Sequence, residues 1–146
     1  MQVVSDPSSK KLWVLGTGGT IAGTASHVSD NIGYTAAQVG IAALLDAVPS
    51  LQTVLRGHPL YSEQVAQVDS KDMSFNIWRA LAQRVVHHLA QNDVLGIVIT
   101  HGTDTLEETA YFLHAVLPPV LIHAKPVVLT CAMRPASALN PDMLLL

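Results

Sequence analysis

The sequence predicts an α/β fold, a mainly parallel sheet with helices on both faces. Short apolar segments alternate with longer segments of helical periodicity, in the order β-α-β-β-α-β-α-β. The apolar run at 94–99 is nearly unbroken and rich in β-branched residues, which is typical of a central strand covered on both sides. Hydrophobic residues make up 49% of the 146 residues and charged residues 13%, which fits a largely buried sheet.

The first predicted elements are a strand and a glycine-rich turn. Residues 12–15 read as a short apolar strand after a loose leader at 1–10. The strand runs into GTGGTIAG at 16–23, where the glycines allow a tight turn. The polar segment at 24–33 is expected to form a mobile loop that ends at Tyr34.

A helix and two strands are predicted next. Thr35 is expected to cap a helix that runs to about Val48 and is stopped by Pro49. Residues 52–55 read as a short strand, and residues 64–68 as another. Polar residues again follow the second of these strands directly.

The longest predicted helix begins after Ser74, which is a suitable capping residue. Near its end, His87 and His88 are adjacent, so we expect their side chains to point in different directions and not to share a metal ion. The core-facing stripe of this helix is predicted to comprise Phe75, Ile77, Trp78, Leu81, Ala82, Val85, Val86 and Leu89.

The central strand at 94–99 leads into another predicted helix. Thr105 and Glu108 stand three residues apart, as in a capping box. The two prolines at 118–119 are predicted to open a linker, and residues 126–130 to form the last buried strand.

Composition narrows the class of protein. The net charge is -3 and no basic run is present, which argues against partners such as nucleic acid or an anionic membrane. No apolar run is long enough to span a bilayer, and no signal peptide is visible, so we expect a soluble, cytoplasmic protein. The single cysteine, Cys131, excludes an intrachain disulfide.

Polar side chains follow three of the predicted strands directly. These are Thr20, Ser70 with Asp72, and Thr103 with Asp104. A parallel sheet brings the carboxyl ends of its strands to one edge, where open α/β folds bind ligands. Capping accounts for one such residue, but the residues after His101 offer more capping groups than one helix start can use.

Two other kinds of site, for a nucleotide and for a metal ion, find little support in the sequence. The turn at 16–23 lacks the third glycine of a dinucleotide-binding fingerprint, and Thr24 stands where a phosphate-binding loop has its lysine. Nucleotide binding is therefore disfavoured. No cluster of His, Cys, Asp and Glu has metal-ligand spacing, so no metal site is predicted.

Two segments resemble a known family. TGGTIAG at 17–23 and THGTDTLEETA at 100–110 are similar to the two signatures of bacterial-type L-asparaginases and the related glutaminase-asparaginases. VVLTCAMRP at 127–135 resembles the family's next strand. The resemblance implies a Rossmann-like or flavodoxin-like asparaginase N-terminal domain, covering nearly the whole chain.

The resemblance also implies roles for individual residues. Thr20 matches the nucleophilic threonine, and Tyr34 the tyrosine of a mobile lid that helps to activate it. Thr103 matches a second essential threonine. Asp104 matches the carboxylate that binds the substrate's α-ammonium group, and Ser70 a contact to its carboxylate.

The implied reaction is hydrolysis of a side-chain amide. A threonine hydroxyl is a poor nucleophile until a neighbouring base takes its proton, and free backbone N–H groups of a glycine-rich turn can stabilise the oxyanion. L-asparagine, and possibly L-glutamine, would yield ammonia through an acyl-enzyme, with no cofactor and no metal. Lys71 stands where many family members have a neutral glutamine that contacts the substrate, so it is a further candidate binding residue. The alternative, that Lys71 is a surface lysine directed into solvent, fits the sequence equally well.

The family's chain is longer than this one. We expect residues 1–146 to form an N-terminal domain that is incomplete at its C-terminal end, with the smaller C-terminal domain absent. The family's homotetramer, a lysine that activates the second threonine, and periplasmic as well as cytoplasmic members are further implications. The isolated chain is therefore expected to be inactive. The alternative is a fragment that only binds amino acids or other subunits.

Overall fold

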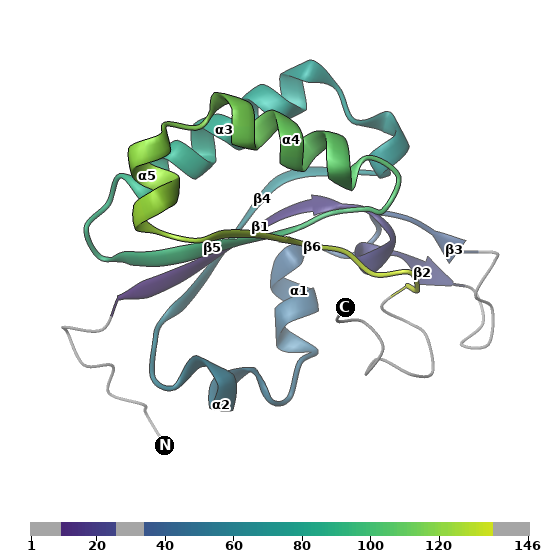
Figure 1. The fold of residues 1–146 in the computed structure, drawn as a ribbon. Coiled ribbons are helices and arrows are strands. Elements are labelled where there is room, and N and C mark those ends of the chain that lie inside the picture. Colours follow the sequence, from purple (N-terminus) through teal and green to yellow (C-terminus); the bar gives the residue numbers. More distant parts are fainter. Residues whose placement is uncertain (1–9, 26–33, 136–146) are drawn as a thin grey trace.

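The computed structural model describes residues 10–25 and 34–135 (Figure 1). The predicted leader at 1–9, most of the predicted loop, at 26–33, and the C-terminal segment 136–146 lie outside the described residues. Expectations for those segments are therefore not tested by the structure.

Four parallel strands form the main sheet, in the order β4-β1-β5-β6. They are β1 (Lys11–Gly18), β4 (Leu60–Val68), β5 (Val94–Thr100) and β6 (Val127–Thr130). The first strand of the chain lies inside the sheet, with β4 on one side and β5 on the other. This order is that of flavodoxin-like folds and confirms the predicted fold class.

Helices cover both faces of the sheet (Figure 1). One face carries α3 (Phe75–Leu89), α4 (Leu106–Val116) and α5 (Pro119–Ala124). The other face carries α1 (Ile41–Asp46) and α2 (Leu51–Leu55). Short elements complete the fold: η1 (Thr20–Ala22), η2 (Ser70–Asp72), and a small antiparallel sheet of β2 (Thr24–Ala25) and β3 (Tyr34–Thr35).

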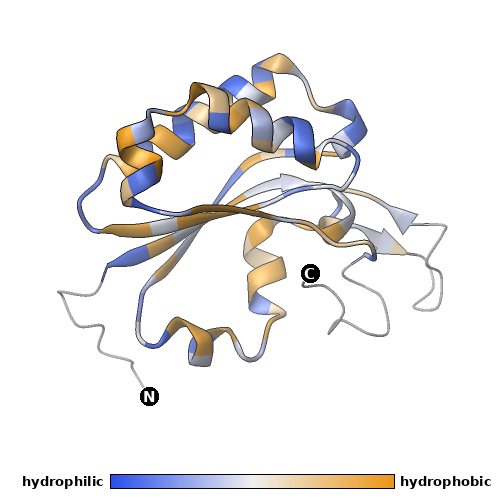
Figure 2. Ribbon diagram, viewed as in Figure 1, coloured by the Kyte–Doolittle hydropathy of each residue, from blue (hydrophilic) through white to orange (hydrophobic). Residues whose placement is uncertain are grey.

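The core lies between the sheet and the layer of α3 and α4. Apolar residues of these elements face inward, while polar residues cover the outer side of the helices (Figure 2). Apolar and polar residues do not alternate along β5, because both faces of this strand are covered. The cluster consists of Leu15, Leu81, Val85, Leu89, Ile97, Ile99, Leu113 and Leu117.

Two predicted elements are wrong in type. Residues 52–55, predicted as a strand, belong to helix α2. Leu51 and Leu55 are four residues apart, so a helix places them on one face, and Leu55 is buried. The predicted linker after 118–119 contains helix α5, since Pro119 suits the first helical position and Leu121 packs against the core cluster.

The helix predicted from Thr35 starts later than expected. Thr35 pairs with Thr24 in the small sheet, and α1 begins at Ile41 after Gly40. The intervening Ala37 has a φ of 58°, a left-handed conformation that interrupts any helix. The strand predicted at 64–68 is β4, which begins earlier, at Leu60. Ser74 caps α3 as expected, accepting a hydrogen bond from Ile77 N at 3.4 Å.

Replacing Leu81 by alanine should lower the free energy of unfolding by about 2–5 kcal/mol, because Leu81 is fully buried in the core and the substitution leaves a cavity. Urea denaturation followed by circular dichroism measures this loss. As a matched control, Val54→Ala removes an exposed side chain of α2 and should stay within about 0.5 kcal/mol of the wild type. Equal effects of the two substitutions would contradict the described packing.

Candidate functional site

The candidate site lies at the carboxyl edge of the sheet, between β1 and β5. These neighbouring strands lead into connections that leave in opposite directions: β1 continues toward α1 and α2, and β5 toward α4 (Figure 1). Such a switch in topology opens a crevice where ligands bind in α/β sheets. Thr20 follows β1 and Thr103 follows β5, so the topology places both predicted residues at this point.

Three backbone segments meet at this edge. A side chain at Gly19, whose φ is 79°, would overlap the backbone of Gly102. A side chain at Gly102 would overlap the hydroxyl of Ser70. The turns that follow β1, β5 and β4 therefore touch one another, and Gly19 and Gly102 are required for that contact.

Ser70 joins the turns after β4 and β5. It is 3% exposed, and its Oγ accepts a hydrogen bond from Asp104 N at 3.1 Å. Its carbonyl oxygen accepts a hydrogen bond from Thr105 Oγ1 at 2.8 Å. The predicted binding residues Ser70 and Asp104 are thus in direct contact, although 34 positions separate them in sequence.

The predicted capping box at Thr105 is wrong. Thr105 occupies the N-cap position of α4 but makes no side-chain capping hydrogen bond, because its hydroxyl binds Ser70 instead. Glu107 and Glu108 do lie in the first turn of α4, where the helix dipole favours negative charge.

Thr20 and Tyr34 form a hydroxyl pair. Their side-chain oxygens are 3.0 Å apart, and Thr20 is buried. The segment that carries Tyr34 is anchored to the turn after β1, since Ala37 N donates to Gly19 O at 3.1 Å and Gln38 N donates to Ala22 O at 2.6 Å. The structure therefore brings these two predicted residues together.

The glycine-rich turn differs in one respect from expectation. Gly19 N–H donates to Val68 O at 2.9 Å, so this group is already paired and is not free for an oxyanion.

Two charged groups and a hydroxyl flank the site. The Asp104 side chain is exposed, and Thr103 Oγ1 donates to its Oδ1 at 3.5 Å. Lys71 Nζ lies 2.7 Å from the Asp72 carboxylate and 3.2 Å from that of Asp69. Hydrogen bonds to Asp72 and Asp69 raise the pKa of Lys71, which keeps it a cation. The Lys71 ammonium group thus forms ion pairs with two carboxylates, and one of them is Asp72.

A buried network behind the β5 turn was not foreseen from the sequence. Trp78 Nε1 donates to Thr109 Oγ1 at 2.8 Å, and Thr109 Oγ1 lies 2.9 Å from His101 Nε2. His101 Nδ1 lies 2.8 Å from Gly102 O. An indole N–H only donates and a carbonyl only accepts, so Thr109 donates to Nε2 and His101 carries its proton on Nδ1. Neutral His101 thus links α3 and α4 to the Gly102 turn.

The sequence carries only a weak signal for this network. In the structure, His101 and Thr109 are both completely buried, so each needs a hydrogen-bond partner. Trp78 lies in the predicted core-facing stripe and carries one donor. Their pairing depends on how α3 packs against α4, which the sequence does not state.

Lys125 lies on the opposite edge of the sheet. Its ammonium donates to Leu89 O at 2.7 Å and to Gln91 O, at the end of α3. It therefore cannot replace the activating lysine that the resemblance implies. The adjacent histidines of α3 diverge as expected, since His88 is buried and His87 is exposed.

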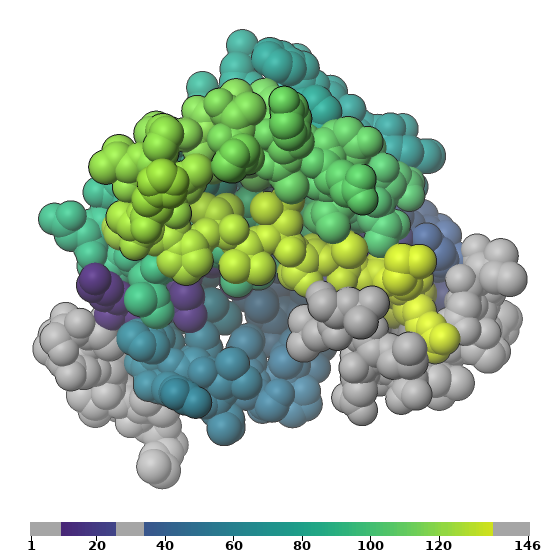
Figure 3. Space-filling view, viewed as in Figure 1, coloured from purple at the N-terminus to yellow at the C-terminus, as the bar shows by residue number. Residues whose placement is uncertain are grey.

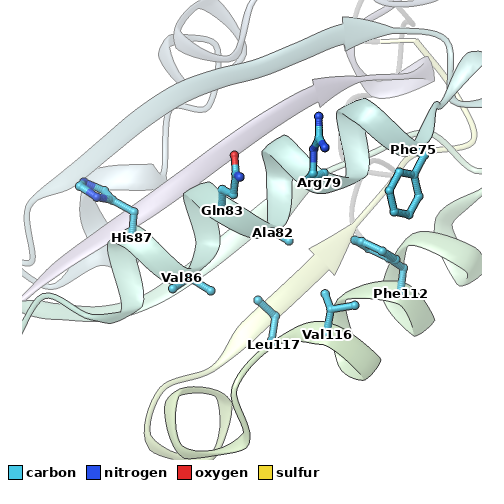
Figure 4. Close-up of a pocket in the computed structure, with 9 residues that line it drawn as sticks. All are labelled: Phe75, Arg79, Ala82, Gln83, Val86, His87, Phe112, Val116 and Leu117. Carbon is cyan, nitrogen blue, oxygen red and sulfur yellow. The ribbon is translucent and has the colours of Figure 1, made fainter.

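A groove of about 510 Å³ lies between α3 and α4 (Figure 4). Phe75 and Phe112 line one end of it, and His87 the other. None of the six predicted site residues lines the groove. Within residues 10–25 and 34–135, no group of three His, Cys, Asp or Glu residues could hold a metal ion. Among the described helices, none is long and apolar enough to cross a membrane.

The fold and the edge residues define an α/β protein of flavodoxin-like strand order, with polar groups gathered at its switch point. Residues 11–144 match the family model described as "Asparaginase, N-terminal". The chain therefore belongs to the asparaginase family, as its two signature segments predict.

Similar proteins carry related names. The chain is 43% identical over 129 residues to L-asparaginase 2 of Bacillus subtilis, covering 88% of this chain and 32% of that protein. It is 42% identical over 132 residues to a glutaminase-asparaginase of Pseudomonas fluorescens, covering 90% and 34%. The crystal structure of a probable cytoplasmic L-asparaginase from Campylobacter jejuni superposes with a TM-score of 0.82 at 40% identity, covering 93% of this chain and 40% of that one. The chain thus spans about a third of the length of the curated relatives it matches.

We expect the free energy of unfolding to fall as the pH drops below about 6.5, the pKa of an unperturbed histidine. Burial lowers the pKa of His101 more than its bond to Gly102 raises it. Between the pKa of His101 in the folded chain and its higher pKa in the unfolded chain, only the unfolded chain binds the proton. The free energy of unfolding therefore falls as the pH drops toward the pKa of the folded chain. Urea denaturation of His101→Gln between pH 7 and 5 should show a shallower decline than the wild type.

Burial also lowers the pKa of His88, against the opposing effect of Glu63, so part of the decline should remain in this variant. Replacing the exposed His114 by glutamine is the control and should leave the decline unchanged. A His101→Gln profile parallel to the wild type would show that His101 does not titrate as described.

Proposed function

We propose that this chain carries the N-terminal part of an L-asparaginase-type active site, which hydrolyses L-asparagine to L-aspartate and ammonia. The observation that carries this proposal is the 3.0 Å contact between Thr20 Oγ1 and Tyr34 OH at the switch point of the sheet. Membership of the asparaginase family and the names of the relatives support the same substrate class.

Thr20 is the proposed nucleophile. Its hydroxyl oxygen attacks the side-chain carbonyl carbon of the substrate and a C–O bond forms. The threonine proton passes to the amide nitrogen, the C–N bond breaks, and ammonia leaves. We assign the accepting role in the Thr20–Tyr34 contact to the Tyr34 oxygen, which makes the threonine oxygen a better nucleophile. Water then hydrolyses the threonine ester and releases aspartate.

Ser70 and Asp104 are the proposed contacts for the α-groups of the substrate. Asp104 is exposed at the edge and can pair with an ammonium group. Ser70 Oγ accepts from Asp104 N, so its own hydrogen remains available to a substrate carboxylate. Thr103 is the proposed second threonine, and Lys71 the proposed influence on the preference between asparagine and glutamine. A glutaminase side activity is consistent with the Pseudomonas relative.

The proposed active form includes more than this chain. We propose that this chain, which spans about a third of its curated relatives, is an incomplete N-terminal domain that is inactive alone. We also propose that the active form is a cytoplasmic homo-oligomer. The same coverage favours one alternative, a fragment that binds amino acids or other subunits without turnover. No cofactor is part of either proposal.

Activity can be tested by grafting residues 11–135 in place of the matching segment of the Bacillus subtilis relative. Thr20→Ala in this graft should reduce ammonia release from L-asparagine to background, because the attacking oxygen is lost, while the circular dichroism spectrum stays unchanged. Thr24→Ala, which removes an exposed threonine from the neighbouring strand β2, is the matched control. Substantial activity in Thr20→Ala would remove the nucleophile assignment.

Asp104→Asn should weaken substrates with a free α-amine far more than their N-acylated analogues. Removing one partner of a charge pair that the bound substrate shields from water costs about 2–5 kcal/mol, which corresponds to tens- to thousands-fold in kcat/KM. Steady-state ammonia release by the graft with both substrate types measures the difference. Equal losses for the two types would return Asp104 to a structural role at the start of α4.

A further inference from the structure

We propose that Thr105 is a positioning residue that holds Ser70 and Asp104 in register, so that the pair selects ligands with both an α-carboxylate and an α-ammonium group. This inference rests on the proposed function of Ser70 and Asp104. It adds a residue to which neither the signature segments nor the proposed mechanism gives a role.

Ser70 is bound at both of its ends by consecutive residues of the β5–α4 turn. Asp104 N–H donates to its side-chain oxygen at 3.1 Å, and the Thr105 hydroxyl donates to its carbonyl oxygen at 2.8 Å. Two hydrogen bonds to different atoms of one residue fix orientation as well as distance. Ser70 also packs closely against Gly102 of the same turn, since a side chain at Gly102 would overlap it.

The Thr105 hydroxyl is used here instead of at the helix start. Side-chain caps stabilise helix starts, and α4 begins without one. The neighbouring helix α3 shows the usual arrangement, because Ser74 accepts a hydrogen bond from Ile77 N. A residue suited to capping α4 therefore tethers η2 to the β5 turn.

The Thr105–Ser70 hydrogen bond affects ligand selection through the distance between Ser70 and Asp104. The unused hydrogen of Ser70 and the Asp104 carboxylate lie on two turns that follow different strands, so nothing within either turn sets their separation. Between the two turns, Thr105 Oγ1 donates to the Ser70 carbonyl oxygen in the backbone of η2, and Asp104 N donates to the Ser70 side chain. Without the Thr105 bond, we expect η2 to shift relative to Asp104, which would weaken simultaneous contact to a carboxylate and an ammonium group.

The experiment compares two ligands on the purified 146-residue chain. L-aspartate carries the α-ammonium group, and succinate has the same two carboxylates without it. NMR titration of the wild type should give a clear preference for L-aspartate. Thr105→Val, which keeps the shape but loses the hydroxyl, should reduce this preference by about fivefold, the effect of one lost hydrogen bond. Thr105→Ser, which keeps the hydroxyl, should restore it.

Two further measurements separate positioning from stability. Hydrogen exchange at the Asp104 amide should accelerate in Thr105→Val and not in Thr105→Ser. Ser74→Ala removes the true cap of α3, so it should lower the melting temperature and leave the ligand preference unchanged.

The outcomes distinguish the two proposals. A wild-type preference for L-aspartate that persists in Thr105→Val overturns the role of Thr105 and leaves the proposed function standing. A wild-type chain without any preference overturns both the assignment of Ser70 and Asp104 and this inference. Loss of preference in Ser74→Ala as well would show that the effect follows stability, which also overturns it.

Discussion

The contact between Gly19, Gly102 and Ser70 is the constraint on which the carboxyl edge depends. Gly19 and Gly102 approach backbone to backbone, and the side chain of Ser70 lies directly against Gly102, so the turns after three adjacent strands are in close contact. The residues next to the two glycines, Thr20 and Thr103, are thereby brought to one place. The parallel pairing of β1 with both neighbours fixes this meeting point, and the Thr17 hydroxyl reinforces it by donating to Thr100 O at 2.8 Å.

A second layer of polar residues supports the edge from inside the protein. The neutral imidazole of His101 connects the Gly102 carbonyl to Thr109 and Trp78, so the packing of α3 against α4 reaches the β5 turn through hydrogen bonds. A buried network of this kind is stabilising only when every member is paired, as these are. The turn that carries Asp104 is consequently held by its neighbours on both sides.

Those parts of the fold that depend on local pattern could be predicted from the sequence. The apolar run at 94–99 became β5, and Ser74 marked the start of α3. The segment at 52–55 was mistaken because four residues do not distinguish a strand from one turn of helix. Thr105 was mistaken because its capping pattern is local, whereas its true partner, Ser70, comes from another strand end. The proximity of Tyr34 to Thr20 likewise follows from tertiary packing and was available only through resemblance.

The position of β1 has a consequence for the order in which the protein folds. This strand is made early, yet both of its neighbours come later in the chain: Trp13 ends between Tyr61 of β4 and Ile97 of β5. During synthesis the apolar residues of β1 remain unpaired until β4 and then β5 emerge from the ribosome. Pairing between distant segments is slow, and unpaired strand edges are prone to aggregate in the interval. Within the described residues, β6 is an edge strand of the sheet, and its residues form part of the molecular surface in Figure 3. A partner that shields unpaired strands during synthesis would therefore favour correct pairing.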